Sequence, residues 1–97
     1  LALSPGLSEQ AARALVQLGV RLVGTDAASI DLARATDLPA HRALLAAGVP
    51  IVENLTNLER LLQLTSGRRF DLHTLPLRIT GGSGSPVRAV AVMREAP

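Results

Sequence analysis

The sequence lacks several residue types, and each absence limits what the protein can do. It has no cysteine, no tryptophan and no tyrosine, and Phe70 is its one phenylalanine. Without cysteine there can be no disulfide, thiol catalysis or thiolate metal site, so any metal must be held by His, Asp or Glu. Without large aromatic residues, the core must be built from Leu, Val, Ile and Ala, which bury less area per residue.

Lysine is also absent, and all ten basic residues are arginine. They alternate with eight acidic residues, and the net charge is +2. A nucleic-acid site usually combines a basic stripe with aromatic stacking platforms, and this sequence has neither, so we expect no nucleic-acid partner. No apolar run reaches the length of a membrane span and no signal-peptide pattern opens the chain. We therefore expect no membrane partner and a cytoplasmic location.

Length and composition predict one globular domain spanning residues 1–97. The chain is 47% hydrophobic and 19% charged, which is typical of a folded protein rather than a disordered tail. It begins with Leu1 and not with Met, which agrees with a fragment, a trimmed product or one piece of a split protein.

The first half of the chain alternates helical and strand patterns, which predicts an α/β fold. Ser8 as N-cap and Gly19 as stop bound an amphipathic helix, and a strand is predicted at 20–25. A second helix is predicted from the N-cap Asp37 to Gly48, followed by a short strand at 51–53. The two strands should run parallel, because the helix between them forms a crossover connection.

The second half predicts a helix followed by two antiparallel strands, so that the sheet is mixed. Thr56 and Glu59 form a capping box for the helix. The apolar phase changes near Pro76, which predicts a break or bulge in the first strand. The last strand, Val87–Met93, is almost continuously apolar, as expected for burial on both faces. Arg88 interrupts it, either as a buried ion-pair or pocket residue or as an exposed rim residue.

Two side chains between Asp37 and Leu58 are candidate metal ligands. His41 shares a helix face with Leu44, so its imidazole should point toward the interior. Glu53 closes the short strand, at its carboxyl end. Imidazole and carboxylate suit a divalent metal such as Zn or Mn, but one pair is a weak signal, since a mononuclear site needs three or more protein ligands. The alternative is a core histidine and a glutamate that caps a neighbouring helix.

Other polar residues carry weaker signals. Asp26, Ser29 and Asp31 follow the carboxyl end of a strand, where α/β proteins bind ligands. They could support a metal site, or Ser29 or Asp31 could make a local turn and cap the next helix, as these residues commonly do. His73, the second histidine, falls outside the apolar phase of its strand, and we expect it to be exposed.

The residues from His41 to Leu58, H-x2-LL-x2-G-V-x-I-x-E-N-L-x-N-L, resemble a signature of the cyclase family of metal-dependent hydrolases, which includes the bacterial kynurenine formamidases. Arg21–Asp31 is similar to the strand and loop that precede this signature in the family. Leu75–Ala91 is similar to the family's closing hairpin, so the resemblance covers nearly the whole chain.

The resemblance implies a layered β/β/α fold, and it implies that His41 and Glu53 are metal ligands. The family's other ligands and its catalytic histidine lie in an N-terminal motif, H-x-G-T-H-x-D-x-P-x-H, which this sequence lacks. The chain therefore resembles the C-terminal half of such an enzyme, with no catalytic residue of its own. The implied reaction is metal-assisted hydrolysis of a formamide, amide or lactam, typically of N-formylkynurenine to kynurenine and formate.

The expected partners follow from this resemblance. They are a small-molecule amide substrate and either the N-terminal half of the same enzyme or a symmetry mate, in a homo-oligomer. The alternative function is a non-catalytic remnant that serves as a binding or assembly module, or a purely structural fragment.

Overall fold

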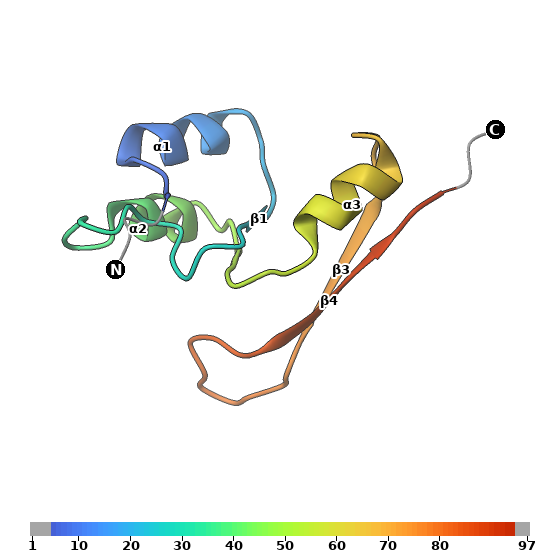
Figure 1. Ribbon diagram of the computed structural model, residues 1–97. Coiled ribbons are helices and arrows are strands. Elements are labelled where there is room, and N and C mark those ends of the chain that lie inside the picture. Colours follow the sequence, from blue (N-terminus) through green and yellow to red (C-terminus); the bar gives the residue numbers. More distant parts are fainter. Residues whose placement is uncertain (1–4, 95–97) are drawn as a thin grey trace. The chain divides into compact units, whose positions relative to one another are not determined.

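The computed structural model describes residues 5–94. The chain divides into two compact units, Leu1–Thr56 and Asn57–Pro97. Figure 1 shows the elements of both units, and each is described by itself. The expectation of a single domain over residues 1–97 stays a prediction.

The first unit contains α1 (Glu9–Gln17), β1 (Val23–Gly24), α2 (Pro39–Ala46) and β2 (Ile51–Val52). The two strands pair in parallel, as predicted, with Val23 opposite Ile51. The strand predicted at 20–25 is shorter than expected, because its pairing partner β2 is only two residues long.

The predicted ends of α1 are confirmed. The Ser8 hydroxyl accepts a hydrogen bond from the Ala11 backbone N–H at 3.1 Å, which satisfies one of the free donors of the first turn. Gly19 follows the helix with φ 83°, a conformation that glycine adopts without steric cost.

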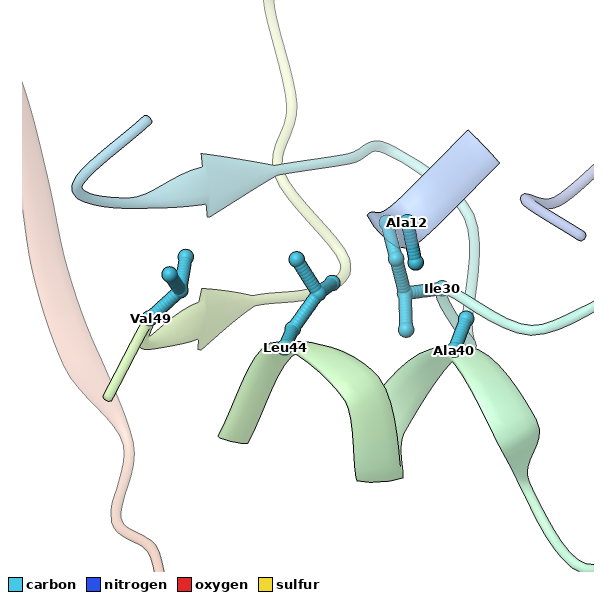
Figure 2. Close-up of a cluster of buried hydrophobic side chains, with 5 residues drawn as sticks. All are labelled: Ala12, Ile30, Ala40, Leu44 and Val49. Atoms are coloured by element: carbon cyan, nitrogen blue, oxygen red, sulfur yellow. The ribbon is translucent and has the colours of Figure 1, made fainter. Parts of the chain in front are cut away.

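The core of this unit consists of small and branched aliphatic side chains, as the shortage of aromatic residues requires. α1 packs on α2, and the buried residues are Ala12, Ile30, Ala40, Leu44 and Val49 (Figure 2). Alanine at two of these positions lets the backbones approach closely. Leu7, Val16, Val20, Val23, Ala43 and Ile51 pack around this cluster.

The start of α2 differs from the prediction. Asp37 is not its N-cap: that position is Leu38, and both residues have left-handed backbone, with φ 63° and 48°. Pro39 is the first helical residue, where its missing N–H costs nothing. Neither Asp37 nor Leu38 supplies the capping oxygen, which comes instead from Asp31, nine residues before Ala40.

The second unit contains α3 (Leu58–Thr65), β3 (Asp71–Pro76) and β4 (Val87–Val92). The predicted capping box is wrong, because α3 begins one residue later than the Thr56 cap requires. Its N-cap is Asn57, with φ 64°, and this residue makes no side-chain capping bond within the described chain. The predicted end of α3 at Ser66–Gly67 is confirmed by left-handed backbone at both residues, with φ 52° and 75°.

β3 and β4 form an antiparallel hairpin in continuous register from Asp71 opposite Val92 to Pro76 opposite Val87. The paired residues contain no bulge, so of the two predicted alternatives only the break at Pro76 is found. Pro76 ends the strand, where the absence of its N–H interrupts no interior pairing. The parallel pair and the antiparallel pair form two separate two-stranded sheets instead of the one mixed sheet that the sequence predicts, and the α/β class is confirmed.

The hairpin is more exposed than its sequence suggests. β4 was predicted to be buried on both faces, but Val90 and Val92 are 41% and 45% exposed. Arg88 and His73 are exposed too, and for His73 this was predicted. Within residues 5–94, no helix has the length and apolar character that crossing a membrane requires.

Candidate functional site

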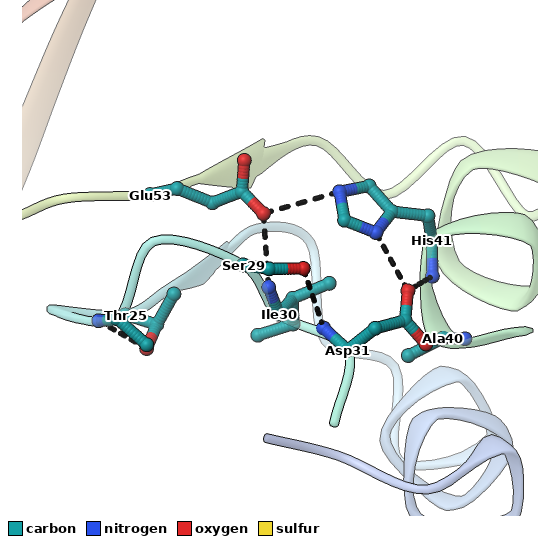
Figure 3. A network of polar contacts seen from close by, with 8 residues as sticks. Thr25, Ser29, Ile30, Asp31, Ala40, His41 and Glu53 are labelled. Carbon is teal, nitrogen blue, oxygen red and sulfur yellow. Dashed lines mark hydrogen bonds and ion pairs between the residues drawn. The ribbon is translucent and has the colours of Figure 1, made fainter. Parts of the chain in front are cut away.

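The candidate site lies where the carboxyl end of β2 meets the first turn of α2, entirely within the first unit (Figure 3). His41 is the third residue of α2, and Glu53 follows β2 directly. The His41 Nε2 and Glu53 Oε2 atoms are 3.1 Å apart. The predicted convergence of these two side chains is confirmed, and their role as metal ligands stays a prediction.

Asp31 contacts His41 from the opposite side of the imidazole ring. Its Oδ2 atom lies 2.6 Å from His41 Nδ1 and accepts the His41 backbone N–H at 3.0 Å. Its Oδ1 atom accepts the Ala40 backbone N–H at 2.7 Å. Asp31 therefore caps α2 and contacts the candidate ligand with one carboxylate. The sequence leaves two alternative roles for Asp31 open, capping the next helix or supporting a metal site. In the structure Asp31 both caps α2 and contacts His41.

The charge of Asp31 is stabilised by these donors although its side chain is only 1% exposed. Burial raises the pKa of the Asp31 carboxyl, but the His41 ring and the backbone N–H groups of Ala40 and His41 outweigh burial and hold the pKa below its ordinary value. The group is thus an acceptor for all three donors at neutral pH.

Glu53 is fixed by the residue next to Asp31. Its Oε2 atom accepts the Ile30 backbone N–H at 2.9 Å, so Glu53 binds a loop and not the helix end proposed as the alternative. The Ser29 hydroxyl accepts the Asp31 backbone N–H at 3.2 Å and closes a local turn. Asp26 is exposed. No residue pattern predicts the Ile30 contact, because a backbone donor has no residue signature.

The pair is partly open to its surroundings. The His41 and Glu53 side chains are 22% and 27% exposed, so further groups can approach them. The 3.1 Å separation of His41 Nε2 and Glu53 Oε2 is that of a hydrogen bond or ion pair, and it brings the two atoms close enough for one cation to contact both. Within residues 5–94, no group of three His, Asp or Glu side chains is arranged so that it could hold a metal ion. A mononuclear site built on His41 and Glu53 would therefore need further ligands.

The sequence was compared with family models, and none matches. It is similar to curated proteins named kynurenine formamidase. That of Salinibacter ruber is 50% identical over 84 residues, covering 87% of this chain and 36% of that protein. That of Sphingopyxis alaskensis is 47% identical, covering 75% of this chain and 32% of that protein. That of Bacillus cereus is 37% identical, covering 89% of this chain and 39% of that protein.

A solved structure described as a potential metal-dependent hydrolase with cyclase activity has a similar fold. It is 32% identical with a TM-score of 0.70, and the match covers 94% of this chain and 42% of that chain. The chain thus spans about a third of the length of the curated relatives that it matches. In sequence and fold the chain is thus similar to part of the proteins named kynurenine formamidase and to part of a metal-dependent hydrolase described as having cyclase activity.

Proposed function

We propose that this chain is the C-terminal part of a metal-dependent amide or formamide hydrolase and that His41 and Glu53 are two of its metal ligands. The observation that carries this proposal is the 3.1 Å approach of His41 Nε2 to Glu53 Oε2, from two elements that adjoin the carboxyl end of the parallel strand pair. The solved relative described as metal-dependent supports a divalent cation.

The donor set suits Zn or Mn, because one imidazole and one carboxylate are ligands that both ions accept. A bound cation would supply polarisation of the substrate carbonyl and a water that is more acidic than bulk water. The chain's own residues orient this site. Asp31 holds the His41 ring, and the Ile30 backbone N–H holds the Glu53 carboxylate.

The proposed reaction follows the relatives named kynurenine formamidase. In it, N-formylkynurenine is hydrolysed to kynurenine and formate, as a step of tryptophan catabolism in the cytoplasm. Two ligands hold a cation weakly, so we expect the chain alone to be inactive. The remaining ligands and the catalytic histidine would come from an N-terminal part carrying H-x-G-T-H-x-D-x-P-x-H, within a homo-oligomer or beside a symmetry mate.

The test of the ligands is a titration of the chain with Zn²⁺ and Mn²⁺, for the wild type and for His41→Ala and Glu53→Gln. We expect each substitution to weaken binding at least tenfold, because it removes half of the donors that the chain supplies. His73→Ala is the matched control, since His73 is the chain's other histidine and is exposed on the hairpin. Equal binding by the His41→Ala variant would disprove the assignment.

The test of activity combines the chain with a polypeptide that carries the N-terminal motif. Metal-dependent formamide hydrolysis by the pair, but not by either part, would support the hydrolase. The exposed apolar side chains of the hairpin favour a second candidate, a non-catalytic assembly module. Stable association without hydrolysis or metal binding would support that module.

A further inference from the structure

We propose that Asp31 is a positioning residue that fixes the ring orientation and protonation site of His41, so that Nε2 is the nitrogen presented to Glu53. The part of this inference that concerns metal affinity rests on the proposed function. The part that concerns which nitrogen of a neutral His41 ring carries the proton does not.

The first step of the argument is the way Asp31 holds His41. One oxygen, Oδ2, receives both the backbone N–H and the ring Nδ1 of the same residue, at 3.0 and 2.6 Å. The side-chain torsions of His41 are therefore restrained at both ends. Ala40 donates to the other oxygen, so the carboxylate itself is fixed by the first turn of α2.

The second step is chemical. An ionised carboxylate has only acceptor sites, so the nitrogen that bonds to it must carry a proton. Asp31 is 1% exposed, so water cannot replace it as the partner of Nδ1. Both ring nitrogens face a carboxylate, and a neutral ring has one proton for the two contacts. The contact with Asp31 is shorter, 2.6 Å against 3.1 Å, and Asp31 is more deeply buried than Glu53, so we assign the proton to Nδ1 and the lone pair to Nε2. Histidines that ligate metals commonly have this carboxylate partner on the second nitrogen.

The third step is that one peptide segment aligns both side chains. Ile30 donates its backbone N–H to Glu53, and the next residue, Asp31, holds His41. The Ile30 carbonyl in turn accepts the Leu7 N–H at 2.8 Å, which anchors the segment to the chain before α1. The spacing of the His41 and Glu53 side chains is thus set by two consecutive residues.

The variant Asp31→Asn distinguishes a role of Asp31 in positioning the His41 ring from a role in capping α2 alone. An asparagine has nearly the same shape, and its oxygen can still accept the Ala40 N–H. In either orientation of the amide, Nδ1 loses its ionised acceptor, because a neutral amide oxygen accepts less strongly than a carboxylate and the NH₂ group does not accept at all. Nε2 still faces the Glu53 carboxylate, so the ring proton moves to Nε2. Asp26→Asn is the matched control, because it removes the same charge from an exposed residue before the same segment.

The experiment uses the full chain labelled with ¹⁵N-histidine, at a pH where both imidazoles are neutral. The chain has only His41 and His73, so the exposed His73 serves as an internal reference. We expect the Nδ1–H form for His41 in the wild type and in Asp26→Asn, and the Nε2–H form in Asp31→Asn. Zn²⁺ affinity should fall about 10–100-fold in Asp31→Asn only.

The outcomes distinguish this inference from the proposed function. An Nε2–H His41 in the wild type would overturn the positioning role, even if Asp31→Asn failed to fold. A folded Asp31→Asn variant with an unchanged ring form would also overturn it. If the wild type shows the Nδ1–H form but binds no Zn²⁺, the positioning role stands and the metal proposal fails.

Discussion

At the residue scale, one buried carboxylate connects a helix end to a candidate ligand. Asp31 accepts three hydrogen bonds, and two of them come from His41. Its capping duty is non-local: nine residues separate it from Ala40, whereas an ordinary N-cap lies two or three residues before its donor. The sequence identifies the two side chains that converge and names Asp31 among three possible supporting residues, but it does not show which of the three contacts His41.

The charge of Asp31 makes stability depend on pH in the acid range. Its folded-state pKa lies below the ordinary value of 3.8, so the unfolded state takes up the proton first as the pH falls. The stabilisation is complete above the unfolded pKa and is lost as the pH falls through the lowered folded pKa. We expect the free energy of unfolding to decrease from about pH 5 downward.

The pH dependence of the free energy of unfolding can be measured by urea unfolding at neutral pH and at several acid pH values. The chains compared are the wild type, Asp31→Asn and Asp26→Asn. Asp31→Asn should be less stable by about 1–3 kcal/mol at neutral pH, because buried donors lose their acceptor. The difference from the wild type should shrink in acid, where the wild-type carboxyl is protonated. A difference that does not change with pH would contradict the argument.

Gly6 permits the close approach of the chain to Asp31. A Cβ atom at this position would lie 2.4 Å from the Asp31 carbonyl oxygen and 2.6 Å from the Leu32 nitrogen, and these backbone atoms cannot rotate away. We expect Gly6→Ala to displace the segment that holds His41 and Glu53. It should destabilise the chain by about 1–3 kcal/mol and weaken Zn²⁺ binding.

Gly84→Ala is the control for this substitution, because a Cβ at Gly84 meets nothing within 4 Å. Thermal unfolding and Zn²⁺ titration of both variants give the comparison. If Gly6→Ala behaves like Gly84→Ala, the close approach does not restrain the segment.

At the element scale, helix ends were predicted well where the cap is local. Ser8, Gly19 and Gly48 behave as their residue types suggest. The starts of α2 and α3 were misplaced by one residue, because left-handed backbone at Leu38 and Asn57 begins each helix later than the Asp37 and Thr56 side chains suggested. The residue type gives no sign of such backbone at Leu38, whereas Asn57 is of a type that tolerates it.

The lengths of the strands, like the starts of α2 and α3, could not be predicted from the residue pattern. The pattern at 20–25 fits a longer strand than β1, since hydrophobic alternation does not say how long the partner is. The phase change near Pro76 reflected the end of β3 and not an interruption within it. Patterns therefore predicted the type and order of the elements, whereas pairing set their bounds.

The turn between α2 and β2 offers a test at this scale. Gly48 has φ 76°, and a Cβ there would meet nothing within 4 Å, so only backbone strain opposes a side chain. Gly48→Ala should cost about 1–2 kcal/mol of stability. Gly48→Asn should cost less, because asparagine tolerates left-handed backbone. Urea unfolding checks the order, and equal stability of all three chains would contradict it.

At the scale of the whole molecule, the two units differ in how well they bury apolar side chains. The first has a contiguous core around Leu44. In the second, the hairpin exposes large aliphatic residues: Leu72, Leu75, Leu77, Ile79, Val90, Val92 and Met93. Exposed apolar surface of this extent usually marks an interaction site. The relatives that the chain matches are more than twice as long as this chain, which agrees with a cover supplied by other polypeptide.

The last prediction concerns this hairpin surface. Val90 and Val92 lie on one face of β4, at alternate positions, with exposed fractions of 41% and 45%. We expect the chain alone to self-associate through this face, and the double variant Val90→Thr/Val92→Thr to do so less. Threonine keeps the β-branched shape that favours a strand and removes apolar area. Ser83→Thr in the hairpin loop is the control. Light scattering and sedimentation measure the effect, and a monodisperse wild-type monomer that unfolds cooperatively would mean that the hairpin needs no cover.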